Sequence, residues 1–350
     1  MSGSSLELTI SATMTLRSIL ALSFTAEQIH KKYGIDPAPA LARNGINPDQ
    51  IDANAVISQA DELAVLSDLY IDLRHDPLAA IKLGSTFGLS AYGAFAMMLM
   101  ACSTVYDGIQ LGVKYQELSY LFSRLDFELE GETASLVLHP YHVPEELHRF
   151  IIDRDVAGTF QFLNMMQALL GQTSKPEKIC IPYPEPFEAQ YYRDSFGCPV
   201  EFGTEVARFV IPKELLNKPL PSANPTAQAL HQQQCDELLK QRRQPENNNL
   251  CSRVEKYLTM FRDSYPSITE CAETFSTSER SFRRQLKEEG TTFQQLLDNV
   301  RSAKACHLLE NTEDSVEKIA GKLGYTEAAA FIRAFKKWHE KTPAQYRKTL

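Results

Sequence analysis

The spacing of apolar residues changes along the chain and predicts which segments are helices and which are strands. Before residue 121 the spacing is helical, with apolar side chains three or four positions apart. The clearest case is residues 58–73, where one face carries Leu63, Leu66, Leu69, Tyr70 and Leu73. Helices are also expected over residues 11–33, 90–101 and 104–120, and Asp76-Pro77 is typical of a helix start.

Between residues 125 and 211 the pattern indicates strands with one long helix among them. Apolar and polar residues alternate over 125–129 and 136–138, and Gly131-Glu132 between them predicts a hairpin. The expected elements that follow are a helix over 144–170, a strand at 178–183 and a further strand pair near 199–211. Helices followed by strands with one long helix favour an α+β domain that ends near residue 217.

Residues 218–249 have the composition of a connection between domains. The segment is rich in Pro, Asn and Gln, with a short helical candidate at 226–240. In that candidate, Leu230, Leu238 and Leu239 are enough for a short helix contact, so a homodimer and a plain linker are both open. From residue 250 onward the pattern is helical with no strand signal. We therefore expect an α+β domain at 1–217, a linker at 218–249 and an all-α domain at 250–350.

The composition is that of a soluble globular protein. Apolar residues make up 43% and charged residues 23%, which excludes disordered and fibrous chains. The seven cysteines are scattered without a Cys-x-x-Cys pair, so we expect no disulfide scaffold and a cytoplasmic location. Residues 83–106 carry no charge, but small and polar residues interrupt them, which favours a buried helix over a membrane span. The first residues lack the pattern of a secretory signal.

The charge is distributed unevenly along the chain. The net charge is −8, yet residues 251–350 hold 17 Lys and Arg against 14 Asp and Glu. An acidic body with a mildly basic final hundred residues indicates that only this last part faces a polyanion.

The final hundred residues contain an internal duplication, with one copy before residue 290 and one after residue 314. Ala272 and Ala320 are 48 positions apart, and the same spacing makes Ser278 and Thr326 counterparts. Each copy has the same order of cap, small residue, turn and amphipathic stretch. Such a repeat indicates two copies of one structural unit.

Each copy has the pattern of a helix-turn-helix unit. Ser267 with Glu270 is a capping box, and Ser315 is a cap candidate in the second copy. The small Ala272 and Ala320 allow two helices to cross closely, and Gly324 suits a left-handed turn. Apolar pairs anchor each second helix, and one long amphipathic helix joins the copies. The pairs are Phe282 with Leu286 and Phe331 with Phe335, and the joining helix carries Phe293, Leu296, Leu297, Val300, Leu308 and Leu309.

The outward face of the second helix in the first copy is basic, with Arg280, Arg283, Arg284 and Lys287. Arginine can donate two hydrogen bonds to guanine O6 and N7 in the major groove, and lysine neutralises phosphate. A solvated basic helix is the alternative for one such helix considered alone. The duplication, with caps and turns in register, favours binding to double-stranded DNA.

The final hundred residues resemble the AraC/XylS family of bacterial transcription regulators. The run SVEKIAGKLGYTEAAAFIRAFKKWHEKTPAQYR (315–347) is similar to that family's signature, and SERSFRRQLKEEGTTFQQLLDNVRSAKACHLL (278–309) to its first recognition helix and connecting helix. Upstream, DPLAAIKLG (76–84), FGCPVEFG (196–203) and LLNKPLPSANP (215–225) resemble the arabinose-binding-like sensor domain of the family.

The resemblance implies two helix-turn-helix units in successive major-groove segments on one face of promoter DNA, and recruitment of RNA polymerase. Arg280, Arg283 and Arg284 fall where the first unit contacts bases and phosphates. In the second unit Arg333 is the corresponding reader, with Lys336 and Lys337 toward phosphate.

The resemblance also implies a sensor for a small-molecule effector and a protein that activates transcription without a cofactor. Sugars, amino acids, aromatic acids and fatty acids fit such a sensor equally well. The protein is expected in the cytoplasm, associated with the nucleoid when it is bound to DNA.

Two departures from the family pattern stand out in the second unit. Ala328, Ala329 and Ala330 occupy positions where base-reading side chains are common, and alanine offers only apolar contact to a thymine methyl group. The second half-site is therefore expected to be read weakly. The glycine usual after the last recognition helix is Glu340, so we expect that helix to end in a different way.

Other signals carry less weight. His139, His142 and His148 have loose spacing without a Cys or carboxylate cluster, which disfavours a metal site. Met and aromatic residues in 92–100 indicate either plain core or an effector pocket. The candidate pocket residues are Tyr92, Phe95, Met97, Met98 and Met100.

An enzyme is not expected. There is no Gly-x-Ser-x-Gly, no phosphate-binding glycine loop and no His-Glu-x-x-His. The alternative is a DNA-repair enzyme that accepts methyl groups on a cysteine. It needs an activated thiolate, and Cys102, Cys180 and Cys198 lack an adjacent base.

Overall fold

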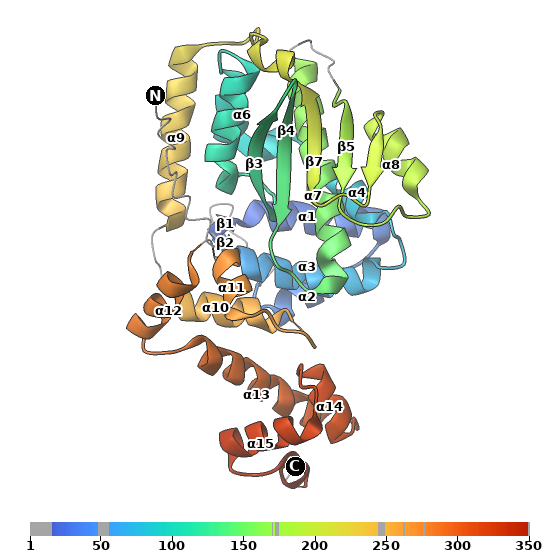
Figure 1. Cartoon of the computed structure of the whole chain (residues 1–350), viewed down its shortest axis with the longest axis vertical. Coiled ribbons are helices and arrows are strands. Elements are labelled where there is room, and N and C mark those ends of the chain that lie inside the picture. Colours follow the sequence, from blue (N-terminus) through green and yellow to red (C-terminus); the bar gives the residue numbers. More distant parts are fainter. Residues whose placement is uncertain are drawn as a thin grey trace. The chain divides into compact units, whose positions relative to one another are not determined.

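The computed structural model describes residues 16–47, 56–169, 171, 175–243, 249–261, 263–275 and 277–348. The chain divides into two compact units (Figure 1). The N-terminal unit is Thr15–Tyr141 with Glu145–Gln244, and the C-terminal unit is Pro245–Leu350 with His142–Pro144. Residues 11–15 of the first predicted helical stretch and 244–248 of the predicted linker lie outside the described residues.

The helices predicted before residue 121 form. They are α1 (Ile19–Tyr33), α3 (Gln59–Leu73), α4 (Ala79–Gly84), α5 (Gly93–Met100) and α6 (Val105–Lys114), joined by the short α2 (Ala38–Arg43) and the 3-10 turns η2 (Leu89–Tyr92) and η3 (Gln116–Leu118). Ser58 caps α3 by accepting a hydrogen bond from the backbone of Asp61, and Thr104 and Asp107 form a capping box at α6. Asp76 accepts the backbone N–H of Leu78, so α4 begins slightly later than Asp76-Pro77 indicates.

Two three-residue strands were not expected from the sequence. They are β1 (Leu16–Ser18) and β2 (Val56–Ser58), which pair antiparallel. Three residues are too few to show an alternating pattern, so the sequence carries no signal for them.

A five-stranded sheet forms the centre of the N-terminal unit. Its strands are β3 (Ser123–Glu130), β4 (Thr133–Pro140), β5 (Lys178–Ile181), β6 (Val200–Phe202) and β7 (Ala207–Pro212), in the order β3-β4-β7-β5-β6 (Figure 1). The predicted hairpin is confirmed, with Gly131 at φ 56° in its turn and Leu125 opposite Leu138.

The predicted strand pair near 199–211 is wrong in its pairing. β6 and β7 are both strands, but β7 lies between β4 and β5, antiparallel to both. β6 instead pairs parallel with β5. Parallel neighbours need a crossover connection, and helix α8 (Ala189–Phe196), which the apolar pattern did not reveal, provides it.

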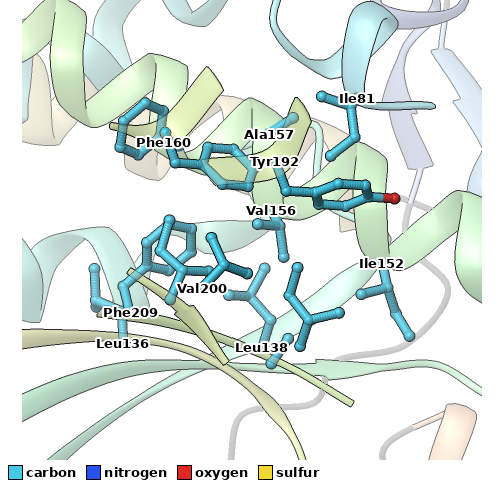
Figure 2. Close-up of a cluster of buried hydrophobic side chains, with 14 residues drawn as sticks. Ile81, Leu136, Leu138, Ile152, Val156, Ala157, Phe160, Tyr192, Val200 and Phe209 are labelled. Atoms are coloured by element: carbon cyan, nitrogen blue, oxygen red, sulfur yellow. The ribbon is translucent and has the colours of Figure 1, made fainter. Parts of the chain in front are cut away.

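The main core lies between the sheet and the predicted long helix, which is confirmed as α7 (Glu145–Leu169) (Figure 2). Ile152, Val156 and Phe160, one turn apart along α7, are buried against sheet residues such as Leu138 and Phe209. Each large apolar side chain buried in this way contributes about 1.5–3 kcal/mol. The packing of α7 on the sheet therefore contributes substantially to the stability of this unit.

Helix α4 crosses α7 at very close range, and Gly84 makes this possible. A Cβ at Gly84 would overlap the carbonyl oxygen of Arg154 and lie 2.9 Å from the Cβ of Ala157. Both are parts of α7 that cannot move without disturbing the core.

Helix α9 (Pro225–Arg243) follows the 3-10 turn η4 (Lys213–Asn217) and contains the predicted helix at 226–240. It is not a free connection. Cys235 and Leu239 are buried in a cluster with Phe95 and Leu99 of α5, and the Tyr115 hydroxyl donates to Asp236 at 2.7 Å. The predicted linker therefore includes a helix that is packed into the N-terminal unit.

All regular elements in the described residues of the C-terminal unit are helices, as predicted. Its helices are α10 (Leu250–Thr259), α11 (Ile268–Thr274), α12 (Glu279–Glu288), α13 (Phe293–Asn311), α14 (Val316–Lys322), α15 (Ala328–His339) and α16 (Pro343–Arg347). In the described parts of both units, every helix is too short or too polar to cross a membrane.

We predict that Gly84→Ala lowers the free energy of unfolding by about 1–3 kcal/mol, because the added methyl group overpacks the contact between α4 and α7. Urea unfolding of the full chain measures this change. The matched control is Gly321→Ala, where an added Cβ has no neighbour within 4 Å. Equal stability of the two variants would show that α4 and α7 do not approach so closely.

Candidate nucleic-acid interface and effector cavity

The first helix-turn-helix unit consists of α11 and α12. Ser267 and Glu270 form the predicted capping box, in which each side chain accepts a hydrogen bond from the other residue's backbone N–H. Ser278 caps α12. Phe282 and Leu286 are buried, and the Phe282 ring packs on Phe275 with 5.7 Å between centroids. One side of α12 is thereby fixed against the unit.

The second unit consists of α14 and α15, with Ser315 as the predicted cap of α14. Gly324 has φ 75°, and a Cβ there would lie 2.8 Å from the carbonyl oxygen of Asp263. The left-handed turn predicted at this glycine is confirmed. Phe331 and Phe335 are fully buried and hold α15 as Phe282 and Leu286 hold α12.

The two units are not spaced uniformly, which corrects one detail of the repeat. The caps Ser267 and Ser315 are 48 positions apart, but Ser278 and Glu327, which directly precede α12 and α15, are 49 positions apart. Ser278 caps its helix with its side chain, whereas Glu327 makes no side-chain capping hydrogen bond. The counterpart of Ser278 is therefore Glu327 and not Thr326. The turn of the second unit is one residue longer, because it holds Gly324.

Helix α13 joins the two units, as predicted. Leu296, Leu297, Val300 and Leu309 are buried along it, while Leu308 and Phe293 are partly buried. The Arg301 guanidinium lies 4.9 Å from the centre of the Tyr265 ring and 4.7 Å from that of Tyr325. This arginine binds neighbouring aromatic side chains, which explains why it does not belong to the basic surface.

The predicted basic residues of α12 are all exposed. They are Arg280, Arg283, Arg284 and Lys287. On a helix with about 3.6 residues per turn, Arg284 lies opposite the midpoint of the buried pair Phe282 and Leu286. Arg283 is paired with Glu279 at 2.8 Å, whereas Arg284 is 3.7 Å from Glu288 and 69% exposed. Arg284 is therefore the side chain that points most directly away from the unit.

Helix α15 has the same geometry with different chemistry. Arg333 lies opposite Phe331 and Phe335, and Lys336 and Lys337 are exposed beside it. With the 49-residue offset, Arg333 corresponds to Arg284, but the position of Arg280 holds the exposed Ala329. The other two alanines, Ala328 and Ala330, are partly buried.

One exposed residue of α12 was missed by the sequence analysis. Gln285 follows Arg284 and is exposed. A glutamine side chain can bond adenine N6 and N7 in the major groove. The signal in the sequence is its position next to Arg284, which lies opposite the buried pair Phe282 and Leu286; a glutamine there is uncharged and does not add to the basic pattern.

Helix α15 ends with a left-handed residue at its C-terminus, the conformation that glycine usually adopts there. The expectation that Glu340 ends this helix in a different way is therefore wrong. Glu340 has φ 59°, the one positive φ among the described non-glycine residues, and its backbone N–H bonds to the carbonyl of Lys336. A residue with a Cβ is strained in this conformation. Glu340 thus has the left-handed backbone of the glycine that is usual at this position in the family it resembles.

The N-terminal unit contains a cavity of about 190 Å³. It lies among α5, α6, α7 and the sheet, and its walls are mostly apolar. Of the predicted pocket residues, Tyr92 and Phe95 line it. Met97 is 46% exposed, Met98 is fully buried in the neighbouring core and Met100 is partly buried, and none of the three lines the cavity.

Five of the seven cysteine thiols are poor nucleophiles, whereas Cys306 lies 3.5 Å from Nε2 of His339. Burial raises the pKa of Cys102 to about 11, and burial with a nearby Glu289 raises the pKa of Cys251 to about 12. Burial also raises the pKa of Cys180, Cys198 and Cys271. A raised pKa lowers the thiolate fraction at neutral pH and so opposes methyl transfer to these sulfurs.

The histidines set aside in the sequence make ordinary contacts. His139 lies 3.3 Å from Asp126 on the neighbouring strand. In the described part of the chain, no three His, Cys, Asp or Glu side chains form a group that could hold a metal ion.

Family models match both units. The model for the arabinose-binding domain of AraC transcription regulators, at their N-terminus, matches residues 34–220, and a helix-turn-helix domain model matches residues 271–349. The matches include the cavity and both recognition helices.

Similar proteins span nearly the same length. The uncharacterized HTH-type transcriptional regulator Rv1395 of Mycobacterium tuberculosis is 28% identical over 91% of this chain and 93% of its own. The ornithine utilization regulator of Pseudomonas aeruginosa is 29% identical over 78% of this chain and 79% of its own. The crystal structure of the transcriptional regulator CdpR from Pseudomonas aeruginosa is 24% identical, covers 89% of this chain and 96% of its own, and has a TM-score of 0.44.

We predict that Glu340→Gly raises the free energy of unfolding by about 1 kcal/mol, because glycine relieves the left-handed strain at the end of α15. Denaturant unfolding of the full chain measures the gain. Glu340→Ala is the control, since it removes the charge but keeps the Cβ and should bring no gain. A gain with alanine equal to that with glycine would assign the effect to the charge.

Proposed function

Because the chain belongs to the AraC family of transcription regulators, we propose that its two helix-turn-helix units divide the recognition of promoter DNA between them. The chain is a DNA-binding regulator with an effector-sensing N-terminal domain. In our proposal α12 supplies most of the sequence specificity, and α15 supplies mainly affinity. The two helices enter successive major-groove segments on one face of the DNA.

One observation supports the proposal that α12 gives most of the specificity and α15 mainly affinity. At equivalent positions α12 presents Arg280 and Arg284, while α15 presents Ala329 and Arg333. A bidentate contact from arginine to guanine discriminates by about 1–3 kcal/mol, whereas alanine offers only a contact to a thymine methyl group. Lys287, Lys336 and Lys337 flank these readers and suit phosphate contacts, which hold the protein on any sequence.

The remaining parts of the proposal concern the whole chain. Residues 1–217 bind the effector, 218–249 connect the domains, and 250–350 bind DNA. Recruitment of RNA polymerase makes the protein an activator that works in the cytoplasm at the nucleoid. Leu230 and Leu238 are exposed on α9 and suit a helix contact between two copies.

We propose that the chain has no catalytic role. The raised thiol pKa values oppose the methyl-acceptor alternative, since a methyl acceptor needs a populated thiolate. The relatives named above are regulators, which agrees with a role in binding alone.

The test compares Arg284→Ala with Arg333→Ala in the full chain. We expect Arg284→Ala to abolish the preference for operator over random DNA, because it removes a base contact. Arg333→Ala should weaken binding while it leaves more of that preference intact. The measurement is the dissociation constant for both DNAs at one fixed salt concentration, since phosphate contacts depend on salt.

The matched control is Lys240→Ala, which removes one exposed positive charge from α9. It should leave binding to both DNAs unchanged. The division between the units is wrong if Arg333→Ala erases the preference for operator while Arg284→Ala leaves it intact.

A further inference from the structure

The walls of the cavity in the N-terminal unit are mostly apolar. They consist mainly of aliphatic and aromatic side chains, among them Phe95, Leu125, Phe160 and Leu163. A cavity of about 150 Å³ lined by such residues stays dry and binds benzene. The volume here, about 190 Å³, therefore suits a small aromatic ring or a medium-length alkyl chain.

Two glycines of α6 line this cavity without another structural reason. Gly108 and Gly112 are one turn apart in the helix, and glycine is less favourable than alanine at such positions. A Cβ at Gly108 would have its nearest neighbour at 3.7 Å and one at Gly112 at 3.9 Å, which are ordinary contacts. Neither glycine has a positive φ. What their missing side chains provide is space in the cavity.

Besides two lysines, the polar side chains that line the wall are Gln116, Ser119, Thr159, Asn164 and Gln167. Gln116 is already engaged, since its amide nitrogen donates to the carbonyls of Val113 and Leu125 and its amide oxygen accepts from the backbone of Leu125. Thr159 of α7 is different: the residue is 9% exposed, and its buried hydroxyl has no hydrogen-bond partner among the described residues. Threonine in a helix occupies two χ1 rotamers, so this hydroxyl can turn to a bound group.

The charged side chains that line the cavity are all positive. The charged residues that line the cavity are Lys175 and Lys218, both exposed, and none of its described lining residues is Asp or Glu. Lys175 donates a hydrogen bond to the carbonyl of Gly197 at 3.0 Å. Two lysines beside an apolar cavity favour a ligand with an apolar body and an anionic end.

We propose that this cavity binds a small monocarboxylate with an apolar body, whose carboxylate is attracted by Lys175 and Lys218 and accepts a hydrogen bond from Thr159. The proposal rests on the effector-sensing role of the N-terminal domain. It disfavours a sugar, because a sugar places hydroxyl groups all round its ring and some of them would face the apolar part of the wall without a hydrogen bond.

The first experiment measures binding of four probes to the full chain by calorimetry at neutral pH. Octanoate should bind, octan-1-ol about tenfold more weakly and octylamine more weakly still, while D-arabinose should not bind detectably. Binding of D-arabinose, or of octylamine as tightly as octanoate, would overturn the proposal.

The second experiment uses variants whose effects on stability and binding have opposite signs. Gly108→Ala with Gly112→Ala should raise the melting temperature of the unliganded chain, because alanine favours the helix, yet weaken octanoate binding about tenfold by filling the cavity. Thr159→Val should leave the melting temperature unchanged or raised, because it removes an unpaired buried hydroxyl, and also weaken octanoate binding about tenfold. Damage to the fold would lower both quantities together.

Two controls separate the causes. Gly321→Ala, a helical glycine of α14 with open space around it, should raise the melting temperature without any change in octanoate binding. Lys175→Ala with Lys218→Ala should weaken octanoate binding but leave octan-1-ol binding unchanged. If the cavity variants bind octanoate as the original chain does, the ligand lies elsewhere and the proposal fails. Operator binding, measured in parallel, reports on the proposed DNA-binding function independently.

Discussion

Each recognition helix is held in place by two buried side chains one turn apart, and this constraint decides which residues can reach DNA. Phe282 and Leu286 fix α12, and Phe331 and Phe335 fix α15. Because the anchored side of a helix determines its opposite side, Arg284 and Arg333 are the outermost side chains of their helices. In our proposal, substitutions on the outer face change DNA recognition, whereas substitutions in the anchoring pairs change the fold.

The sequence predicts most of this arrangement because its signals are local. Caps such as Ser267 with Glu270, the glycine turn at Gly324 and apolar pairs at i, i+4 depend on residues close together in the chain. The turn of the second unit is one residue longer, but the sequence does not reveal this, because the 48-residue spacing of Ala272 and Ala320 indicates a uniform repeat. The true correspondence depends on where α15 begins, which only the structure shows.

The order of the strands in the sheet could not be predicted from the sequence, for a different reason. The alternating pattern identifies β6 and β7 as strands, but it does not specify their partners, and α8 is too short to show a strong helical period. The cavity could not be predicted from the sequence either, because the residues that line it are far apart in the chain. Of the residues that the sequence suggested for an effector pocket, Tyr92 and Phe95 line the cavity, whereas Gly108, Gly112 and Thr159 have no feature that marks them before the structure is known.

Helix α5 connects the cavity with the helix that leads out of the N-terminal unit. Phe95 and Leu99 line the cavity, and both belong to the cluster that buries Cys235 and Leu239 of α9. A ligand bound in this cavity, as we propose, would contact the same helix on which α9 packs. Helix α5 would then link the ligand to the segment that precedes the DNA-binding unit.

The most direct test of unequal reading is the selection of bound sequences from a random DNA library by the full chain and by Ala329→Arg. For the original chain we expect one half-site with strongly preferred bases and one with weak preference. Ala329→Arg places an arginine at the position equivalent to Arg280 and should add a guanine preference in the weak half-site alone. Equal preference in both half-sites of the original chain, or a gain in the strong half-site, would contradict the assignment of specificity to α12.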